Sequence, residues 1–451
     1  MIRGKIILML TRRQFLVASA LLASPFNSLA FAQNSRIAGV ISPYRWGTTP
    51  IPVSGEIAAE LTIVDQAVQE VMRKHGIVGC SICVTRDSEV AYIQAYGYAE
   101  LTDKPFMPET TTRCGSVAKS ITALAALVLV DEGQLTLDTK ILPLLRNIDV
   151  VPKPVGGATV DSRTANITVR NLMDHTSGLP GGATYTAWRA DRNVAQLHGL
   201  TQTATGSDVA ADALGNFRLL TDPGTKYQYA NANYVLLARV IEASCGMSFS
   251  QYLSQIVLPR FGVTAEEIHV SRNQTGPDSP ERGPNEAAYY QTSQEKFVSF
   301  IPFEQGQGRV FGEAYRGYAT ESSDGAGGIA CSAVGLARIL TNINSAKPAI
   351  SQKMLSEIIT PPSHYTKLPD FNPKTSSYYS KGFDVRQSDG KYWLAHGGMT
   401  LHCGGAIGHN AGYQFAVLSN WNNASAPYVD AILDKAVAEA IATARARGVI
   451  A

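Results

Sequence analysis

The chain has 451 residues, of which 45% are hydrophobic and 17% are charged. This length and balance allow a large buried core and exclude a disordered or fibrous protein. The formal net charge of +2 includes four basic residues within positions 1–32, a segment with no acidic residue. Without that segment the 39 basic residues become 35 against 37 acidic ones, so the composition gives no support for nucleic acid or an anionic membrane as a partner.

Residues 1–32 have the pattern of an export signal. The stretch T-R-R-Q-F-L (Thr11–Leu16) opens an apolar run that is too short to form a stable membrane anchor. The run ends at Ala30-Phe31-Ala32, a small-x-small pattern that signal peptidase cleaves. Paired arginines before Phe and Leu are typical of a twin-arginine signal, which predicts a periplasmic or secreted protein with no stable anchor after cleavage. The alternative, a buried N-terminal helix, is disfavoured by the flanking charges.

The first half of the mature chain alternates strands and helices after a Pro/Gly/Ser-rich linker at 33–56. A helix, a hairpin of two strands and a second helix are predicted, at Glu56–His75, Gly79–Arg86 with Glu89–Tyr98, and Ser116–Gly133. The middle, about 134–325, mixes short helices with polar loops. The two longest of these loops, 181–215 and 271–308, are expected to line a pocket and to encode its choice of substrate.

The last part of the chain is again rich in strands. The pattern predicts one helix, four strands and a closing helix, at Ser332–Ile343, Gly382–Arg386, Tyr392–His396, Gly404–Gly408, Tyr413–Asn420 and Pro427–Arg447. Strands therefore gather at both ends of the chain, with a largely helical middle. This order predicts an α+β fold in which one domain, 57–451, has an antiparallel sheet flanked by helices and an inserted helical subdomain at about 134–325.

Six cysteines follow the export signal, and they lie at positions 80, 83, 114, 245, 331 and 403. Cys80 and Cys83 fall within a predicted strand, where residues i and i+3 point to opposite faces, so they should not pair with each other. The sequence does not choose among the other pairings. It also has no second C-x-x-C and no paired histidines to complete a zinc site, so we predict neither a metal nor a cofactor.

The helix predicted from Ser116 carries a lysine one turn later, at Lys119. Free backbone N–H groups at a helix start favour a developing anion, and burial lowers the pKa of a lysine towards that of a general base. The pair can thus form a nucleophile with its base. The structural alternative is an N-capping serine followed by a lysine whose amine reaches solvent. A second Ser-x-x-Lys, Ser293–Lys296, lies in a polar loop with no helix behind it.

Context decides between these two matches. Tyr229-Ala230-Asn231 precedes an apolar helix, and L-A-H-G-G-M (Leu394–Met399) ends a strand. Together with D-H-T-S-G-L-P (Asp174–Pro180) and G-Q-L-T-L-D (Gly133–Asp138), these motifs resemble the serine β-lactamase and penicillin-binding protein superfamily. The resemblance covers roughly 57–421 and is closest to the class C-like branch, which includes family VIII esterases, D-aminopeptidases and DD-peptidases. It implies a β-lactamase/transpeptidase-like fold.

The resemblance assigns a role to each matching residue. Ser116 is the nucleophile, and Lys119 and Tyr229 exchange its proton; which of the two is the general base stays open. Asn231 would orient Lys119 and the carbonyl side of the substrate. The backbone N–H groups of Ser116 and Met399 would form the oxyanion hole.

The third motif departs from the pattern of true β-lactamases in this branch. They have Lys-Thr-Gly where this chain has His396-Gly397-Gly398, and that lysine and threonine hold the carboxylate of a β-lactam. Strong β-lactamase activity is therefore not expected. We expect the histidine to contact the substrate and to be partly charged near neutral pH, and the glycines to leave room for the substrate. Lys374-Thr375-Ser376 precedes the strand and is rejected as a substitute. His175 is interpreted as a structural loop histidine.

The predicted function is that of an exported serine hydrolase that cleaves an ester, amide or peptide bond of a small molecule through an acyl-enzyme on Ser116. One alternative is a β-lactamase or D,D-carboxypeptidase acting on β-lactams or cell-wall peptides. Another is a non-catalytic protein that recognises cell-wall peptides; it is disfavoured because Ser116, Lys119 and Tyr229 are all present. A standard α/β-hydrolase is disfavoured because the chain lacks a G-x-S-x-G motif.

Overall fold

The computed structural model describes most of the chain from residue 44 to residue 450. Left out within that range are 57–60, 102–103, 182–186, 284, 293–298, 308–310, 313, 344, 346–347, 389–390, 411 and 423–427. The predicted export signal, 1–32, and the second Ser-x-x-Lys match, 293–296, lie outside the described residues.

An antiparallel nine-stranded sheet forms the centre of the described chain, and both ends of the sequence contribute to it. Its strands in spatial order are β1 (Val53–Glu56), β3 (Glu89–Glu100), β2 (Gly79–Arg86), β13 (Tyr413–Ser419), β12 (Gly404–Asn410), β11 (Lys391–Met399), β10 (Phe383–Ser388) and β9 (Tyr378–Ser380), with β4 (Lys104–Pro105) paired to β3. Strands β2 and β13 join the two halves, with Ile82 opposite Val417. This arrangement confirms the predicted α+β class.

The segment expected to be a linker is part of the fold where it is described. Trp46 is only 2% exposed, and its indole N–H donates to the carbonyl of Ile77 at 2.9 Å. Further on, β1 pairs with β3, with Val53 opposite Tyr96. The expectation failed because a Pro- and Gly-rich composition describes local turns but not the burial of one large aromatic ring.

The hairpin of β2 and β3 shows how local sequence sets the first half of the sheet. Asp87 and Ser88 form its tight turn, with φ of 48° and 64°. Two consecutive residues with positive φ give the turn a twist that matches the twist of the two paired strands. As predicted, Cys80 and Cys83 point to opposite faces of β2, because each packs in a different core cluster.

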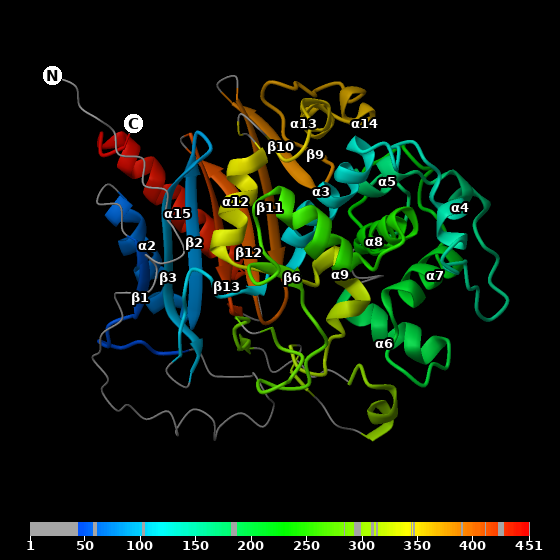
Figure 1. Cartoon of the computed structure of the whole chain (residues 1–451), viewed down its shortest axis with the longest axis horizontal. Coiled ribbons are helices and arrows are strands. Elements are labelled where there is room, and N and C mark those ends of the chain that lie inside the picture. Colours follow the sequence, from blue (N-terminus) through cyan, green and yellow to red (C-terminus); the bar gives the residue numbers. More distant parts are fainter. Residues whose placement is uncertain are drawn as a thin grey trace.

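Helices cover both faces of the sheet (Figure 1). On one face lie α2 (Thr62–His75) and the closing helix α15 (Val429–Ala446), which pack on each other and on the sheet. Helix α2 buries Val64, Val68 and Met72, a spacing of one side chain per turn. On the other face α12 (Ala333–Ile343) packs on β2, β3 and β13. Helices α3 (Ala118–Asp131) and α8 (Asn231–Cys245) pack on each other and belong with α12 to the larger core cluster.

The middle of the chain forms a region of short helices beside the sheet (Figure 1). These helices are α4 (Ile141–Arg146), α5 (Val169–Met173), α6 (Ala187–Leu197), α7 (Gly206–Asn216), α9 (Phe249–Tyr252), α10 (Leu258–Arg260) and α11 (Asp324–Gly327). Outside the region follow α13 (Gln352–Ile359) and α14 (Ser363–Thr366). Small sheets pair β5 (Thr112–Arg113), β8 (Ile329–Cys331) and β6 (Ile268–Val270), and β7 (Tyr290–Gln291) with β14 (Trp421–Asn422).

The first of the two expected loops, 181–215, is not a loop over its whole length. It contains α6 and most of α7. Helix α7 begins with a capping box between Thr205 and Asp208, and its small residues pack closely on α8. Glycine and alanine, which suggested a loop, here permit close helix packing. Among the described residues, no helix is long and apolar enough to cross a membrane.

Candidate active site

Ser116 lies at the point where the chain enters α3. It occupies a 3₁₀ turn, Gly115–Val117, and the α-helix begins at Ala118, two residues later than predicted. Gly115 has a φ of 54°, and a Cβ there would lie 2.5 Å from the backbone nitrogen of Met399. Only glycine fits both this conformation and this approach, so the turn holds the serine against β11.

Lys119 lies in the first turn of α3, within a run of buried residues from Ala118 to Leu129, and is itself 0% exposed. The amine donates hydrogen bonds to Ser116 Oγ at 3.0 Å and to the carbonyl oxygen of Ala326 at 2.5 Å. Burial lowers its pKa to about 7, because the charged form loses its hydration. A large fraction of the amine is therefore neutral near pH 7 and able to accept a proton.

Aromatic rings surround this amine. Lys119 Nζ lies 5.0 Å from the centre of the Tyr229 ring and 5.9 Å from that of Tyr234. In the described part of the chain no carboxylate forms an ion pair with it. Ring faces attract a cation less strongly than a carboxylate does, so the depressed pKa persists.

Tyr229 faces the same serine from the segment before α8. Its hydroxyl shares a hydrogen bond with Ser116. Burial raises the pKa of the Tyr229 phenol well above its usual value, and the bond to Ser116 opposes this only in part. The phenol is therefore protonated near neutral pH. Asn231 is the first residue of α8. It is not among the hydrogen-bond partners of Lys119 within the described chain, which are Ser116 and Ala326.

His175 supports the backbone around Tyr229. Its Nδ1 accepts hydrogen bonds from the N–H of Ala230 at 3.3 Å and from Asn233 Nδ2 at 2.9 Å, and Ser177 Oγ donates to Asn233 Oδ1 at 2.6 Å. Its ring centre lies 4.3 Å from that of Tyr229. Burial, with the charge of Lys119, holds the His175 pKa well below its usual value. This geometry agrees with the interpretation of His175 as structural.

His396 lies on β11 and is 4% exposed. Its Nδ1 donates to the carbonyl oxygen of Gly397 at 2.6 Å, so Nε2 is an acceptor for the Tyr379 hydroxyl at 3.3 Å. Burial and the nearby charge of Lys119 lower the His396 pKa to about 3. The expectation of a partly charged histidine was therefore wrong, because a sequence does not reveal burial next to a second amine.

The two glycines after His396 have different surroundings. A Cβ at Gly398 would lie 2.6 Å from the backbone nitrogen of Ser116, so β11 and the serine turn touch through backbone. This contact places the backbone nitrogens of Ser116 and Met399 close together, and their role as an oxyanion hole stays a prediction. A Cβ at Gly397 would meet only Asp430 Oδ2, at 3.4 Å. The rejected Lys374–Ser376 stretch precedes β9, with Lys374 and Thr375 exposed.

Sequence reasoning did not identify several groups of this site. The carbonyl of Ala326, the ring of Tyr379 and the amide of Asn233 come from segments with no motif of their own. Of these three, Asn233 could have been found from the sequence, because it is the second asparagine in the Y-A-N-A-N stretch that contains Tyr229. Within the described residues, no group of His, Cys, Asp or Glu side chains could hold a metal ion.

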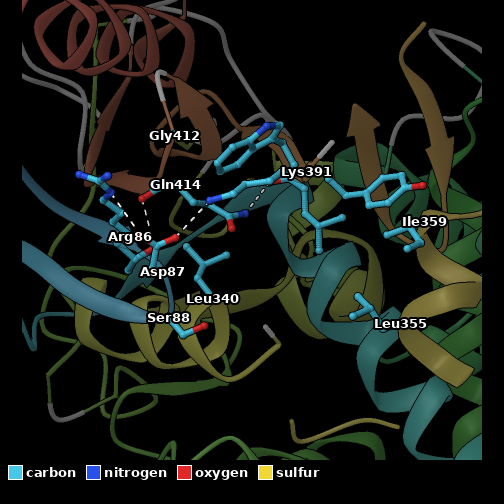
Figure 2. Close-up of a pocket in the computed structure, with 13 residues that line it drawn as sticks. Arg86, Asp87, Ser88, Leu340, Leu355, Ile359, Lys391, Gly412 and Gln414 are labelled. Atoms are coloured by element: carbon cyan, nitrogen blue, oxygen red, sulfur yellow. Dashed lines mark hydrogen bonds and ion pairs between the residues drawn. The ribbon is translucent and has the colours of Figure 1, made fainter. Parts of the chain in front are cut away.

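A cavity of about 300 Å³ lies beside the turn between β2 and β3 (Figure 2). Ion-paired side chains at the β2–β3 turn border it, with Lys391 Nζ 3.2 Å from Asp87 Oδ1, and Leu340 and Leu355 supply apolar lining. Its described lining contains none of Ser116, Lys119 and Tyr229. The candidate chemistry therefore does not belong to this cavity.

Comparisons with known proteins identify the family of the chain. A sequence model of the beta-lactamase family matches residues 64–439. Penicillin-binding protein 4* of Bacillus subtilis is 28% identical over 214 residues, covering 46% of this chain and 41% of that protein. Protein flp of Staphylococcus aureus is 26% identical over 219 residues, covering 48% and 40%. The chain thus spans about two fifths of the length of these curated relatives.

Solved structures share the fold. The D-amino acid amidase of Ochrobactrum anthropi has a TM-score of 0.59 at 20% identity, covering 84% of this chain and 99% of that one. A beta-lactamase/D-alanine carboxypeptidase from Pseudomonas syringae has a TM-score of 0.59 at 19% identity, covering 85% and 99%. An octameric penicillin-binding protein homologue from Pyrococcus abyssi has a TM-score of 0.58 at 23% identity, covering 86% and 77%.

Proposed function

The chain belongs to the beta-lactamase family, and on this basis we propose that it is a serine hydrolase that cleaves an ester or amide bond through an acyl-enzyme on Ser116. The observation that carries this proposal is the pair of groups at the Ser116 hydroxyl. A buried amine with a pKa of about 7 lies 3.0 Å away, and a protonated phenol is also hydrogen-bonded to that hydroxyl.

Acylation follows from these protonation states. The neutral amine of Lys119 takes the proton of Ser116 as Oγ attacks the carbonyl carbon of the substrate. The oxygen of the tetrahedral intermediate receives hydrogen bonds from the N–H groups of Ser116 and Met399. Tyr229 donates its proton to the leaving oxygen or nitrogen, and the Lys119 ammonium returns a proton to Tyr229. The pKa directions favour Lys119 as the base, since the Lys119 pKa is lowered and that of Tyr229 is raised.

Deacylation repeats the same transfers with water. The amine of Lys119 accepts a proton from a water molecule that attacks the ester carbonyl of acylated Ser116. The intermediate then collapses, Ser116 Oγ leaves and recovers its proton, and a carboxylic acid departs. Tyr229 and the oxyanion donors act as they do in acylation.

Esters and amides are favoured over β-lactams as substrates. His396 is neutral, and Gly397 has no hydroxyl, so neither supplies the contacts that a lysine and a threonine make to a β-lactam carboxylate. The structural likeness to a D-amino acid amidase supports including D-amino-acid amides among the test substrates. The twin-arginine pattern in residues 1–32 supports export to the periplasm or beyond.

One set of measurements tests the proposal. The protein is incubated with p-nitrophenyl esters, D-amino-acid amides and nitrocefin, and separately with a fluorophosphonate, which labels activated serines. We expect hydrolysis of an ester or amide and a single adduct in the Cys114–Lys119 peptide. An adduct confined to another residue, or activity abolished by chelators, contradicts the mechanism. Ser293→Ala, in the second Ser-x-x-Lys match, is the control variant.

A further inference from the structure

A cavity of about 300 Å³ borders the third motif on β11. Its polar lining is acidic: Asp384 comes from β10, and Asp430 and Asp434 come from α15. His396 and Gly397 of β11 complete this side of it. We refer to it below as the acidic cavity.

The acidic cavity borders the catalytic groups at His396, whose ring centre lies 6.4 Å from that of Tyr229. Strand β10 pairs with the first half of β11, and this pairing ends at Asp384 opposite Ala395. From His396 to Met399 the pairing in the described sheet is to β12 alone, which leaves the other edge open beside the serine turn. The charge of Asp384 also contributes to the raised pKa of Tyr229. The acidic cavity therefore adjoins the catalytic groups through His396, although its described lining does not include Ser116, Lys119 or Tyr229.

Two glycines keep the acidic cavity open. A Cβ at Gly397 would lie 3.4 Å from Asp430 Oδ2, and one at Gly408 would lie 2.2 Å from Asp434 Oδ1. Neither glycine has a positive φ, so the backbone does not require glycine at either position. What the missing side chains provide is access to the two carboxylates from β11 and β12.

Negative charge in the acidic cavity is poorly compensated. Its described lining contains no lysine or arginine. His396 and His409 are neutral near pH 7, with pKa values lowered to about 3 and about 4, chiefly by burial. Among the groups that line the cavity, the charge of Arg386 affects the pKa of His409, which it lowers. Burial raises the pKa of Asp430 to about 6, and backbone N–H groups, that of Ala431 first and that of Gly398 among them, oppose this only in part. Its Oδ1 is buried with no partner in the described structure.

We propose that the acidic cavity binds a positively charged group, an ammonium or a guanidinium, in the leaving group of the substrate. A cation there would pair with the carboxylates of Asp384, Asp430 and Asp434 that line the cavity, whereas a substrate carboxylate would be repelled. The leaving group is assigned because His396, which lines the cavity, lies beside Tyr229, with 6.4 Å between the ring centres, and Tyr229 protonates the leaving atom. This inference rests on the proposed hydrolase and narrows its substrate class.

The test compares two methylphosphonothiolates that differ in one charge. One has thiocholine as its leaving group, and the other has 3,3-dimethylbutanethiol, which has the same shape without the charge. The rate of Ser116 labelling is followed by intact-protein mass spectrometry, and each rate is divided by that reagent's own rate of hydrolysis by hydroxide. We expect the cationic reagent to label Ser116 about tenfold faster or more, the effect of a charge-assisted contact.

Variants locate the origin of this preference. In Asp430→Asn/Asp434→Asn the ratio should fall to about one, while the neutral reagent labels at the wild-type rate and thereby shows that the fold and the nucleophile are intact. Glu439→Gln, an exposed position on the same helix, is the matched control and should keep the ratio. Gly397→Thr should lower the ratio by filling the cavity.

The outcomes separate the inference from the proposed function. Equal corrected rates for the two reagents in the wild-type protein, or a preference that survives in Asp430→Asn/Asp434→Asn, overturn the acidic cavity as a cation site. Both results leave the hydrolase intact, because Ser116 has reacted. Absence of labelling at Ser116 by either reagent overturns the hydrolase and with it this inference.

Discussion

Two buried lysines on neighbouring segments have opposite surroundings. Lys381, in the turn between β9 and β10, is 2% exposed, and its amine lies 3.2 Å from Asp174 Oδ2 and 3.8 Å from Glu357 Oε2. Lys119 is 0% exposed and has a serine, a carbonyl and aromatic rings around it. The first lysine fastens the turn to the loop that carries His175. The second has no countercharge, and its pKa is lowered to about 7.

The difference shows what burial does to a charge. With carboxylates in contact, a buried lysine forms ion pairs and links two segments of the fold. Without one, the lost hydration favours the neutral amine, which is a base. Residue type and burial are the same in both regions, so the neighbouring charge alone assigns the role.

The largest expected effect on activity comes from replacing Ser116, the residue whose proton Lys119 accepts. Ser116→Ala should lower kcat by a factor on the order of 10⁴ to 10⁶. Its melting temperature should change little, because the hydroxyl occupies a turn that backbone contacts already hold. Ester hydrolysis and thermal unfolding are measured side by side. Loss of activity in Ser293→Ala with retention in Ser116→Ala would reverse the assignment of the motif.

Exchanging each lysine for methionine tests the comparison directly. Lys119→Met should lower kcat/KM by roughly 10³ or more without loss of stability, because it removes an uncompensated buried amine. Lys381→Met should cost about 3–5 kcal/mol of stability, since it leaves Asp174 buried and unpaired, with kcat nearly unchanged while the protein is folded. Urea unfolding and initial rates measure both. The same phenotype in the two variants would invalidate the contrast.

The pH dependence sharpens the comparison. As pH falls below about 7, the Lys119 amine becomes protonated, so kcat/KM should fall about tenfold per pH unit. In the unfolded chain the same amine keeps its proton up to about pH 10.5. Because the unfolded state binds more protons between these values, the wild-type protein should gain stability as pH rises through this interval. Lys119→Met should lack this gain. A rate profile that is flat from pH 5 to 8 would exclude Lys119 as the base.

The smallest effect is expected at His396, which is neutral and hydrogen-bonded at both ring nitrogens. His396→Ala should lower kcat/KM about tenfold, much less than Ser116→Ala or Lys119→Ala, because one uncharged contact is lost. The acid limb near pH 7 should remain. If His396→Ala is instead as inactive as Ser116→Ala, the histidine belongs to the proton relay.

Most strands and helices, and the family, could be predicted from the sequence, because short-range patterns encode them. Apolar spacing located most strands and helices, and the period of two along a strand placed Cys80 and Cys83 on opposite faces. The order of the three motifs identified the family and selected Ser116, Lys119 and Tyr229. These three do come together in the structure.

Tertiary structure alone decided the electrostatics. The carbonyl that binds Lys119, the neutrality of His396 and the carboxylates beside Gly397 depend on segments that are far apart in the chain, at Ala326, Tyr379 and Asp430. No local pattern states which buried group will meet which charge, because desolvation and ion pairing depend on the folded surroundings. The sequence determined that a serine would have a lysine beside it. The fold decided that this lysine, unlike Lys381, would have no carboxylate partner.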